Sequence, residues 1–379
     1  MNKKELELYI HIPFCVRKCS YCDFLSAPAT EQTREAYMAA LFAEIGGRAK
    51  DYSDRTVTSI FIGGGTPSLL SGEQIGQLMD RIREQFAMAQ DAEITMEVNP
   101  GTASAEKLRN FYTAGINRLS IGMQSAQAEE LKNLGRIHDF EGFCQVYREA
   151  VEAGFTNINV DIMSGLPGQT LASYRDTLEK VLHLEPMPQH ISAYSLIVEE
   201  GTPFAAMAER GELPLPEEET ERAMYEETIE VLAKYGFHRY EISNYARDGY
   251  ECRHNVGYWI RRDYLGFGIG AASLIDNVRF QNEKSLGAYL AHPLESREEE
   301  QTLTVQDRME ETMFLGLRLT RGVSCVDFAE QYGRTVEEVY GEVIARNVAD
   351  GLLTVTERKE NQKKDRLLAL TKRWLDLSN

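Results

Sequence analysis

Residues 9 to 24 read Tyr9-Ile-His-Ile-Pro-Phe-Cys15-Val-Arg-Lys-Cys19-Ser-Tyr-Cys22-Asp-Phe24. A short apolar run leads directly into three cysteines with CxxxCxxC spacing. The other three cysteines, Cys144, Cys252 and Cys325, are scattered along the chain, so the six do not resemble a disulfide framework. We therefore expect a metal-binding loop near the amino terminus, in a protein of the reducing cytoplasm.

The spacing of the three cysteines leaves three interpretations. The thiolates could hold three irons of a [4Fe-4S] cluster, whose fourth iron would lack a protein ligand. They could serve a zinc ion with a distant fourth ligand, or they could be unrelated buried thiols. The x3/x2 spacing is rare among zinc patterns and favours the cluster. An open iron corner can be chelated by the amino and carboxylate groups of S-adenosylmethionine (SAM), which is then the second expected cofactor.

The residues around the cysteines narrow the interpretation. With Tyr-x-His-Ile-Pro-Phe before them and Tyr-Cys-Asp-Phe at their end, the stretch resembles the radical SAM superfamily. More narrowly, it is similar to the branch of oxygen-independent coproporphyrinogen III dehydrogenases and HemW-type heme chaperones. The resemblance covers nearly the whole chain. It implies that Cys15, Cys19 and Cys22 hold the cluster, whose electron breaks the sulfonium bond of SAM to give methionine and a 5'-deoxyadenosyl radical.

Composition excludes several classes of protein. The 379-residue chain has a formal net charge of -18 and a pI near 5.0, which argues against broad binding to nucleic acid. No apolar run approaches the about 18 residues of a membrane span. The first residues lack the apolar core of a signal peptide, so we expect a cytoplasmic protein.

Short runs rich in Ile, Val, Thr and Tyr alternate with longer amphipathic runs in the first half of the chain. Six such βα units predict a parallel sheet, either an open doubly wound sheet or an incomplete barrel. The resemblance implies the barrel, a partial (β/α)6 TIM-like fold of the α/β class. Strands are expected at 6–12, 56–62, 93–98, 117–121, 157–162 and 190–196, and helices at 33–50, 71–86, 103–114, 140–153 and 173–184.

The chain is expected to divide into two parts. Residues 1–290 would form the barrel core with an extension that carries a heme motif, and the acidic stretch 291–304 would be a linker. Residues 305–379 resemble a small, mainly helical domain of winged-helix type. Its expected role is to cover the barrel mouth or to dock a partner or a membrane surface.

Glycines and polar residues stand where the expected strands end, which is where barrel folds place their chemistry. Gly64, Gly65 and Thr66 belong to a Gly-Gly-Gly-Thr-Pro turn whose backbone can approach a ligand closely. Taken singly, each polar residue at a strand end could equally well have a structural role or bind a ligand. The family resemblance implies a SAM pocket made by Tyr9, Tyr21, Gly64, Gly65, Thr66, Glu97, Gln124, Arg136 and Asp161.

A second stretch with chemical character is Cys252-Arg-His254-Asn-Val-Gly-Tyr258-Trp259. An isolated histidine is by default a satisfied surface residue, but an imidazole beside two aromatic rings also suits a heme pocket. The pattern His-Asn-x-x-Tyr-Trp resembles the signature of the heme-chaperone branch. It implies that His254, Tyr258 and Trp259 contact heme, and whether His254, Cys252 or another side chain binds iron stays open.

One departure separates the two branches of the family. Coproporphyrinogen dehydrogenases carry a fourth cysteine two residues after the third, whereas here Asp23 and Phe24 follow Cys22. The resemblance therefore implies a heme chaperone that passes heme to a respiratory acceptor protein, with an electron donor such as flavodoxin or ferredoxin. The alternatives are oxidative decarboxylation of coproporphyrinogen and a radical methyl transfer that opens heme. Whether SAM is turned over, and hence whether the protein is an enzyme, stays open.

Overall fold

The computed structural model describes residues 3–295, 297–360 and 363–372. These residues form a twelve-stranded sheet and a three-stranded sheet. The large sheet has the order β12-β11-β10-β9-β1-β2-β3-β4-β5-β6-β8-β7. Neighbouring strands from β9 through β1 to β6 pair in parallel, and the strands at both ends pair antiparallel.

The six expected strands and the expected helices are present. The strands are β1 (Lys4–Ile12), β2 (Arg55–Gly64), β3 (Ala87–Val98), β4 (Arg118–Gln124), β5 (Ile158–Ser164) and β6 (His190–Ser195). The helices between them are α1 (Glu31–Arg48), α2 (Gly72–Gln85), α3 (Ala105–Thr113), α4 (Ala128–Leu134), α5 (Phe140–Ala153) and α6 (Leu171–Leu182). The short helix α4 was not predicted. The parallel sheet with its crossover helices confirms the α/β class and the partial barrel.

The second half of the chain extends both ends of the sheet. Beyond β6 lie α7 (Pro203–Glu209), α8 (Glu218–Lys234), β7 (His238–Arg239), β8 (Asn244–Ala246) and α9 (Arg253–Trp259). They are followed by β9 (Tyr264–Phe267), β10 (Ala272–Ile275), β11 (Val278–Asn282), α10 (Leu286–Ala291) and β12 (Arg297–Thr302). Strand β12 lies inside the stretch predicted as a linker, because it pairs with β11.

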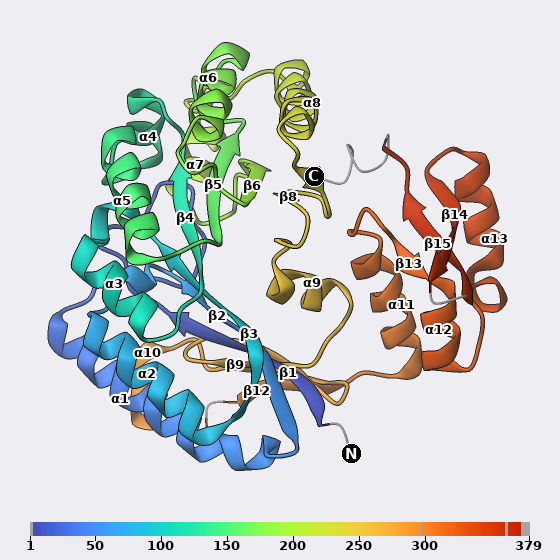
Figure 1. The fold of residues 1–379 in the computed structure, drawn as a ribbon, viewed down its shortest axis with the longest axis horizontal. Helices are drawn as coiled ribbons and strands as arrows, with labels where there is room; N and C mark the ends of the chain where they lie inside the picture. The colour runs from blue at the N-terminus through green and yellow to red at the C-terminus, as the bar shows by residue number, and fades with distance from the viewer. Residues whose placement is uncertain (1–2, 296, 361–362, 373–379) are drawn as a thin grey trace.

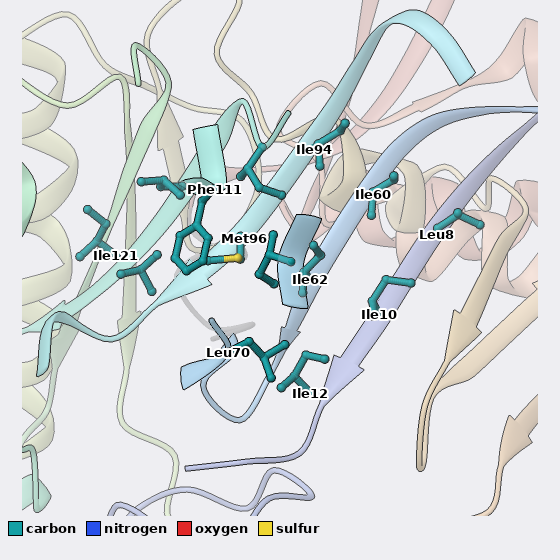
Figure 2. Packing of buried hydrophobic residues seen from close by; sticks show 14 of the residues in the cluster. Leu8, Ile10, Ile12, Ile60, Ile62, Leu70, Ile94, Met96, Phe111 and Ile121 are labelled. Carbon is teal, nitrogen blue, oxygen red and sulfur yellow. The ribbon is translucent and has the colours of Figure 1, made fainter. Parts of the chain in front are cut away.

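The alternation of side chains gives the parallel strands two different faces. Leu8, Ile10 and Ile12 of β1 lie in a row among the buried apolar residues, as Figure 2 shows. The residues between them on β1, Glu7 and His11 among them, face the other way. Figure 1 shows α1 to α6 along one face of the curved sheet, and α9 with the C-terminal helices on the other. The apolar core therefore lies under the outer helices, and the inner face is polar.

The C-terminal residues form a separate small core. It consists of α11 (Val305–Gly316), β13 (Val323–Ser324), α12 (Cys325–Tyr332), α13 (Val336–Ala349), β14 (Leu353–Glu360) and β15 (Lys363–Leu370). Met309, Phe328, Val336 and Leu368 are buried together in it. Three helices and a three-stranded sheet thus form the small, mainly helical domain of winged-helix type that was predicted, with a hairpin after α13. The proposed division of the whole chain into domains stays a prediction.

Candidate functional site

The carboxyl ends of β1 to β6 surround a cavity of about 540 Å3, which we call the main cavity. Its lining contains every residue predicted for the cluster and for SAM except Tyr9. These residues come from the ends of five strands, β1 to β5, and from the segments that follow them. The structure therefore brings these residues together at one end of the barrel, and their roles in binding the cluster and SAM stay predictions.

The cysteine loop is held in place by backbone hydrogen bonds at both ends. The N–H of Cys15 donates to the carbonyl of Ala27 at 3.2 Å, and the N–H of Ala27 donates to Pro13 at 2.9 Å. Farther along the loop, the N–H of Ser20 donates to Leu134 at 3.0 Å. The loop is thus anchored to β1 on one side and to α4 on the other.

Two donors point at the cysteine sulfurs. The hydroxyl of Thr66 lies 3.4 Å from Sγ of Cys15, and Nη1 of Arg136 lies 3.9 Å from Sγ of Cys19. Donors of this kind stabilise thiolates, which are the form that binds metal. Burial raises the pKa of the Cys22 thiol, and the neighbouring cysteines act in the same direction. In the described residues no group of His, Cys, Asp or Glu side chains has the geometry to hold a single metal ion.

The glycine turn after β2 is pressed against the start of the cysteine loop. Gly64 has φ of 107°, and a Cβ at this position would lie 2.5 Å from the ring of His11. A Cβ on Gly65 would lie 2.7 Å from the carbonyl oxygen of Phe14. Both positions therefore require glycine. Gly64 has a left-handed backbone conformation, and at both Gly64 and Gly65 a side chain would collide with a neighbouring residue.

Two half-buried carboxylates, Glu97 and Asp161, line the main cavity. Burial, followed by the nearby Asp161, raises the pKa of Glu97 to about 8. Burial also raises the pKa of Asp161, although Asn159 donates to it at 2.7 Å and Ser120 at 3.3 Å. A cationic ligand would lower the pKa of both carboxyl groups, because a nearby positive charge favours their ionised forms. The sulfonium and ammonium groups of SAM are such cations.

Gln124 and Arg136 lie close together at the end of β4. Gln124 has φ of 70° and accepts a hydrogen bond from the hydroxyl of Tyr194 at 3.0 Å. Nη2 of Arg136 donates to the carbonyl of Gly122 at 2.6 Å, whereas its buried Nε has no partner among the described residues. A guanidinium with an unused donor at this place fits a carboxylate.

Tyr9 lies outside the main cavity. It lines a second cavity of about 370 Å3, together with His11, Tyr258 and Tyr264. The two cavities share Gly64, Glu97 and Phe24. His11 joins this region to the cysteine loop, since its Nε2 lies 2.8 Å from the carbonyl oxygen of Leu25. The second cavity is therefore a neighbour of the proposed SAM site.

The predicted heme residues lie on α9, which packs against the inner face of the sheet. Glu93 on β3 accepts hydrogen bonds from the backbone N–H groups of Arg253 and His254, both at 3.2 Å. The ring of His254 is 1 % exposed and contacts Ser59 Oγ at 2.9 Å and the hydroxyl of Tyr258 at 3.1 Å. Burial lowers the pKa of His254 to about 3, so the ring is neutral.

The three residues of this motif differ in what they contact. Both ring nitrogens of His254 are engaged in this conformation. Tyr258 lines the second cavity. Trp259 points to the C-terminal residues, where the guanidinium of Arg318 lies 4.5 Å from its ring centre. None of the three lines the main cavity.

Several polar residues of the main cavity were not predicted. They are Arg118, Asn159, Ser192, Tyr194, Asn244 and Asn255. Arg118 carried a signal in the sequence, because a charged residue at the start of an otherwise apolar strand is costly to bury without a purpose. The other five come from four separate elements, β5, β6, β8 and α9, and their convergence could not be seen before folding.

Comparisons with known proteins agree with this geometry. Residues 9–181 match the model of the radical SAM superfamily, and residues 303–359 match the HemN C-terminal domain. The chain is 39% identical to the heme chaperone HemW of Bacillus subtilis, over 92% of this chain and 93% of that protein. The chain belongs to the HemW heme chaperone family of the radical SAM superfamily. The HemW protein of Escherichia coli is 37% identical over 92% of each chain.

A solved structure supports the fold over its whole length. Coproporphyrinogen III oxidase (HemN) of Escherichia coli, described as a radical SAM enzyme, superposes with a TM-score of 0.84. It is 28% identical in sequence, and the match covers 100% of this chain and 89% of that one. In the part of the chain that the structure describes, no helix combines the length and apolar character needed to cross a membrane.

Membership of the superfamily gives this chain a [4Fe-4S] cluster and SAM as cofactors. The residues fit both, because three thiols share one wall of the main cavity with the glycine turn and with the unused Nε of Arg136. When bound, the cluster would supply the electron for any reductive cleavage of the sulfonium bond of SAM. Cys15, Cys19 and Cys22 would hold the cluster, and Arg136 with the glycine turn would orient SAM.

Proposed function

We propose that this protein is a heme chaperone that binds a [4Fe-4S] cluster, SAM and heme and passes the heme to an acceptor protein in the cytoplasm. The observation that carries the proposal is the similarity to HemW proteins over 92% of the chain. The geometry of the main cavity supports it, since cluster and SAM residues converge there. Cys15, Cys19 and Cys22 would bind the cluster, and the strand-end residues of the main cavity would bind SAM.

The acceptor would be a respiratory protein, and the electron donor would be a flavodoxin or a ferredoxin. Peripheral contact of the chaperone with a membrane surface would bring it to such an acceptor. The C-terminal residues support a docking role, because they form a small core of their own beside the barrel. Nucleic acid is not among the proposed partners.

His254, Tyr258 and Trp259 would contact heme. Of these, Tyr258 has access to a cavity in this conformation. Ligation of iron by His254 would require its ring to leave Ser59 and Tyr258, and so would require α9 to move. A movement of α9 would also change the contact between α9 and the C-terminal residues, because the ring of Trp259 packs against the guanidinium of Arg318.

The second candidate is oxidative decarboxylation of coproporphyrinogen. The close superposition with coproporphyrinogen III oxidase favours it. Asp23 and Phe24 argue against it, because they stand where that branch of the family carries a fourth cysteine.

One experiment separates the candidates. The protein is reconstituted anaerobically with iron and sulfide and incubated with SAM and a reductant, once with heme and once with coproporphyrinogen. We expect heme binding, lost or weakened in His254→Ala, and no protoporphyrinogen. Formation of protoporphyrinogen would contradict the chaperone proposal, and a linear tetrapyrrole product would point to a heme-opening methyl transfer.

A further inference from the structure

We propose that the main cavity contains a carboxylate-binding subsite, formed by Arg118, Asn244 and Asn255, that is separate from the SAM residues. The ligand class is a carboxylate on an apolar body. The identification of that carboxylate as a propionate of a tetrapyrrole rests on the proposed function, whereas the anion site itself does not.

Arg118 is the centre of the subsite. Its side chain is 2 % exposed and lines the main cavity from the inner face of β4. The guanidinium forms no hydrogen bond or ion pair with any described residue, and its Nε is buried without a partner. A buried cation with five donors is costly unless it meets an anion.

The nearby acids are engaged elsewhere. Glu93 accepts from the backbone N–H groups at the start of α9, and Asp161 accepts from Asn159 and Ser120. Neither acid lies within ion-pair distance of Arg118 in the described structure. The guanidinium is therefore stabilised by these charges at a distance, and its donors stay available to a ligand.

Two amides also line the main cavity. Oδ1 of Asn244 on β8 accepts from the hydroxyl of Ser192 at 2.6 Å, which leaves the Nδ2 of Asn244 as a donor. The side chain of Asn255 on α9 lines the cavity and forms no hydrogen bond with a described residue. Three elements, β4, β8 and α9, thus contribute donors for which the described residues provide no acceptor.

SAM has one carboxylate, and Arg136 at the end of β4 is placed to take it. A second guanidinium in the same cavity has no corresponding group on SAM. At the rim, Phe24 is 57% exposed and Ile197 is 64% exposed, and both line the main cavity. Exposed apolar side chains above buried donors suit a ligand with a flat apolar body and a carboxylate.

The test combines a change in the protein with a change in the ligand. Anaerobically reconstituted protein with SAM is titrated with heme and with heme whose two propionates are methyl esters, and binding is followed by absorbance. For the unchanged protein, we expect the ester to bind roughly tenfold more weakly or worse, because a charge-assisted hydrogen bond is lost. Arg118→Gln should weaken heme binding by a similar factor and leave ester binding nearly unchanged.

A second variant tests the same subsite if Arg118→Gln fails to fold. Asn255→Asp keeps the guanidinium and adds a negative charge, so it should weaken binding of heme and not of the ester. Arg109→Gln, on the exposed face of α3, is the matched control and should bind both ligands like the unchanged protein.

The outcomes are distinguishable. Equal binding of heme and its ester by the unchanged protein would overturn the subsite and leave the proposed function standing. A loss of SAM affinity in Arg118→Gln, with unchanged discrimination between heme and ester, would assign the guanidinium to SAM and also overturn the subsite. Absence of any heme binding by the unchanged protein would overturn the proposed function, and with it the propionate as ligand.

Discussion

Burial controls the charge of Glu7 on the inner face of β1. The side chain is fully buried, and burial raises its pKa to about 8 although Arg262 donates to it at 3.3 Å. A Cβ on Gly257 of α9 would lie 2.1 Å from its carboxylate, so α9 can pack this closely only with glycine there. Glu7 therefore carries a proton at neutral pH.

This pKa predicts how stability depends on pH. Between pH 6.5 and 8 the folded protein keeps the proton on Glu7, whereas the unfolded chain, with an ordinary pKa of 4.5, has lost it. The free energy of unfolding should therefore fall as pH rises, by about 1.4 kcal/mol per pH unit. Glu97 acts in the same direction, since its pKa is also raised to about 8.

Glu7→Gln should remove about 1.4 kcal/mol per pH unit, which is about half of the combined slope from Glu7 and Glu97, in the protein without its cofactors. Urea unfolding at pH 6.5, 7.25 and 8 measures it, with the exposed Glu73→Gln as control. Below pH 6.5 the lowered pKa of His254 acts with the opposite sign and would hide the effect. An unchanged slope in Glu7→Gln would show that Glu7 is ionised in the folded protein.

Gly64 gives the second prediction for a single residue. Gly64→Ala places a Cβ 2.5 Å from the ring of His11 at a φ of 107°, so we expect a loss of more than 1 kcal/mol in stability and weaker SAM binding. Gly76→Ala is the matched control, since nothing lies within 4 Å of the added Cβ on helix α2. The control should be stabilised by roughly 0.5–1 kcal/mol. Calorimetry and SAM titration distinguish the two.

At the scale of elements, α9 is a seven-residue helix whose position depends on other elements. Isolated helices of this length are not stable in water. Its first backbone N–H groups donate to the buried Glu93, and the ring of His254 stacks on Phe61 with centroids 5.3 Å apart. Contacts with Phe61 on β2 and Glu93 on β3 therefore stabilise the helix.

Glu93→Gln should loosen α9, because the charge that faces its N-terminus is lost. We expect a cost of about 1–3 kcal/mol and faster hydrogen exchange over residues 253–259. Asp91→Asn is the control, since Asp91 also contacts Arg253, at 2.9 Å, but is 82% exposed. The control should change stability by less than about 1 kcal/mol. Equal effects of the two variants would contradict this account of α9.

At the scale of the whole molecule, one buried carboxylate joins the C-terminal residues to the barrel. Glu311 on α11 contacts Arg261 at 2.8 Å and Arg279 at 2.7 Å, and it is 6 % exposed. Both arginines belong to the barrel side of the chain. Together with Trp259 under Arg318, this contact makes the segment that carries the heme motif a neighbour of the C-terminal core.

Glu311→Gln leaves two arginines without a buried counter-charge, so we expect it to destabilise this contact by about 3 kcal/mol. Hydrogen exchange and limited proteolysis should then increase over residues 305–372 more than over residues 4–195. Glu310→Gln, one position away and exposed, is the control and should leave both unchanged. Uniform loosening of the whole chain would instead indicate a single cooperative unit.

The sequence by itself determined the six alternating strand and helix units, the cysteine loop and the glycine turn, because these depend on local periodicity, spacing and backbone freedom. Tertiary structure decided what the sequence could not. Strand β9 lies beside β1 although more than two hundred residues separate them, and β12 occupies part of the predicted linker. His254 is sealed by Ser59 and Tyr258, and Arg118 meets Asn244 and Asn255 at one cavity. Burial and partners of a polar side chain are set by residues far away in the chain, and these approach only when the sheet has formed.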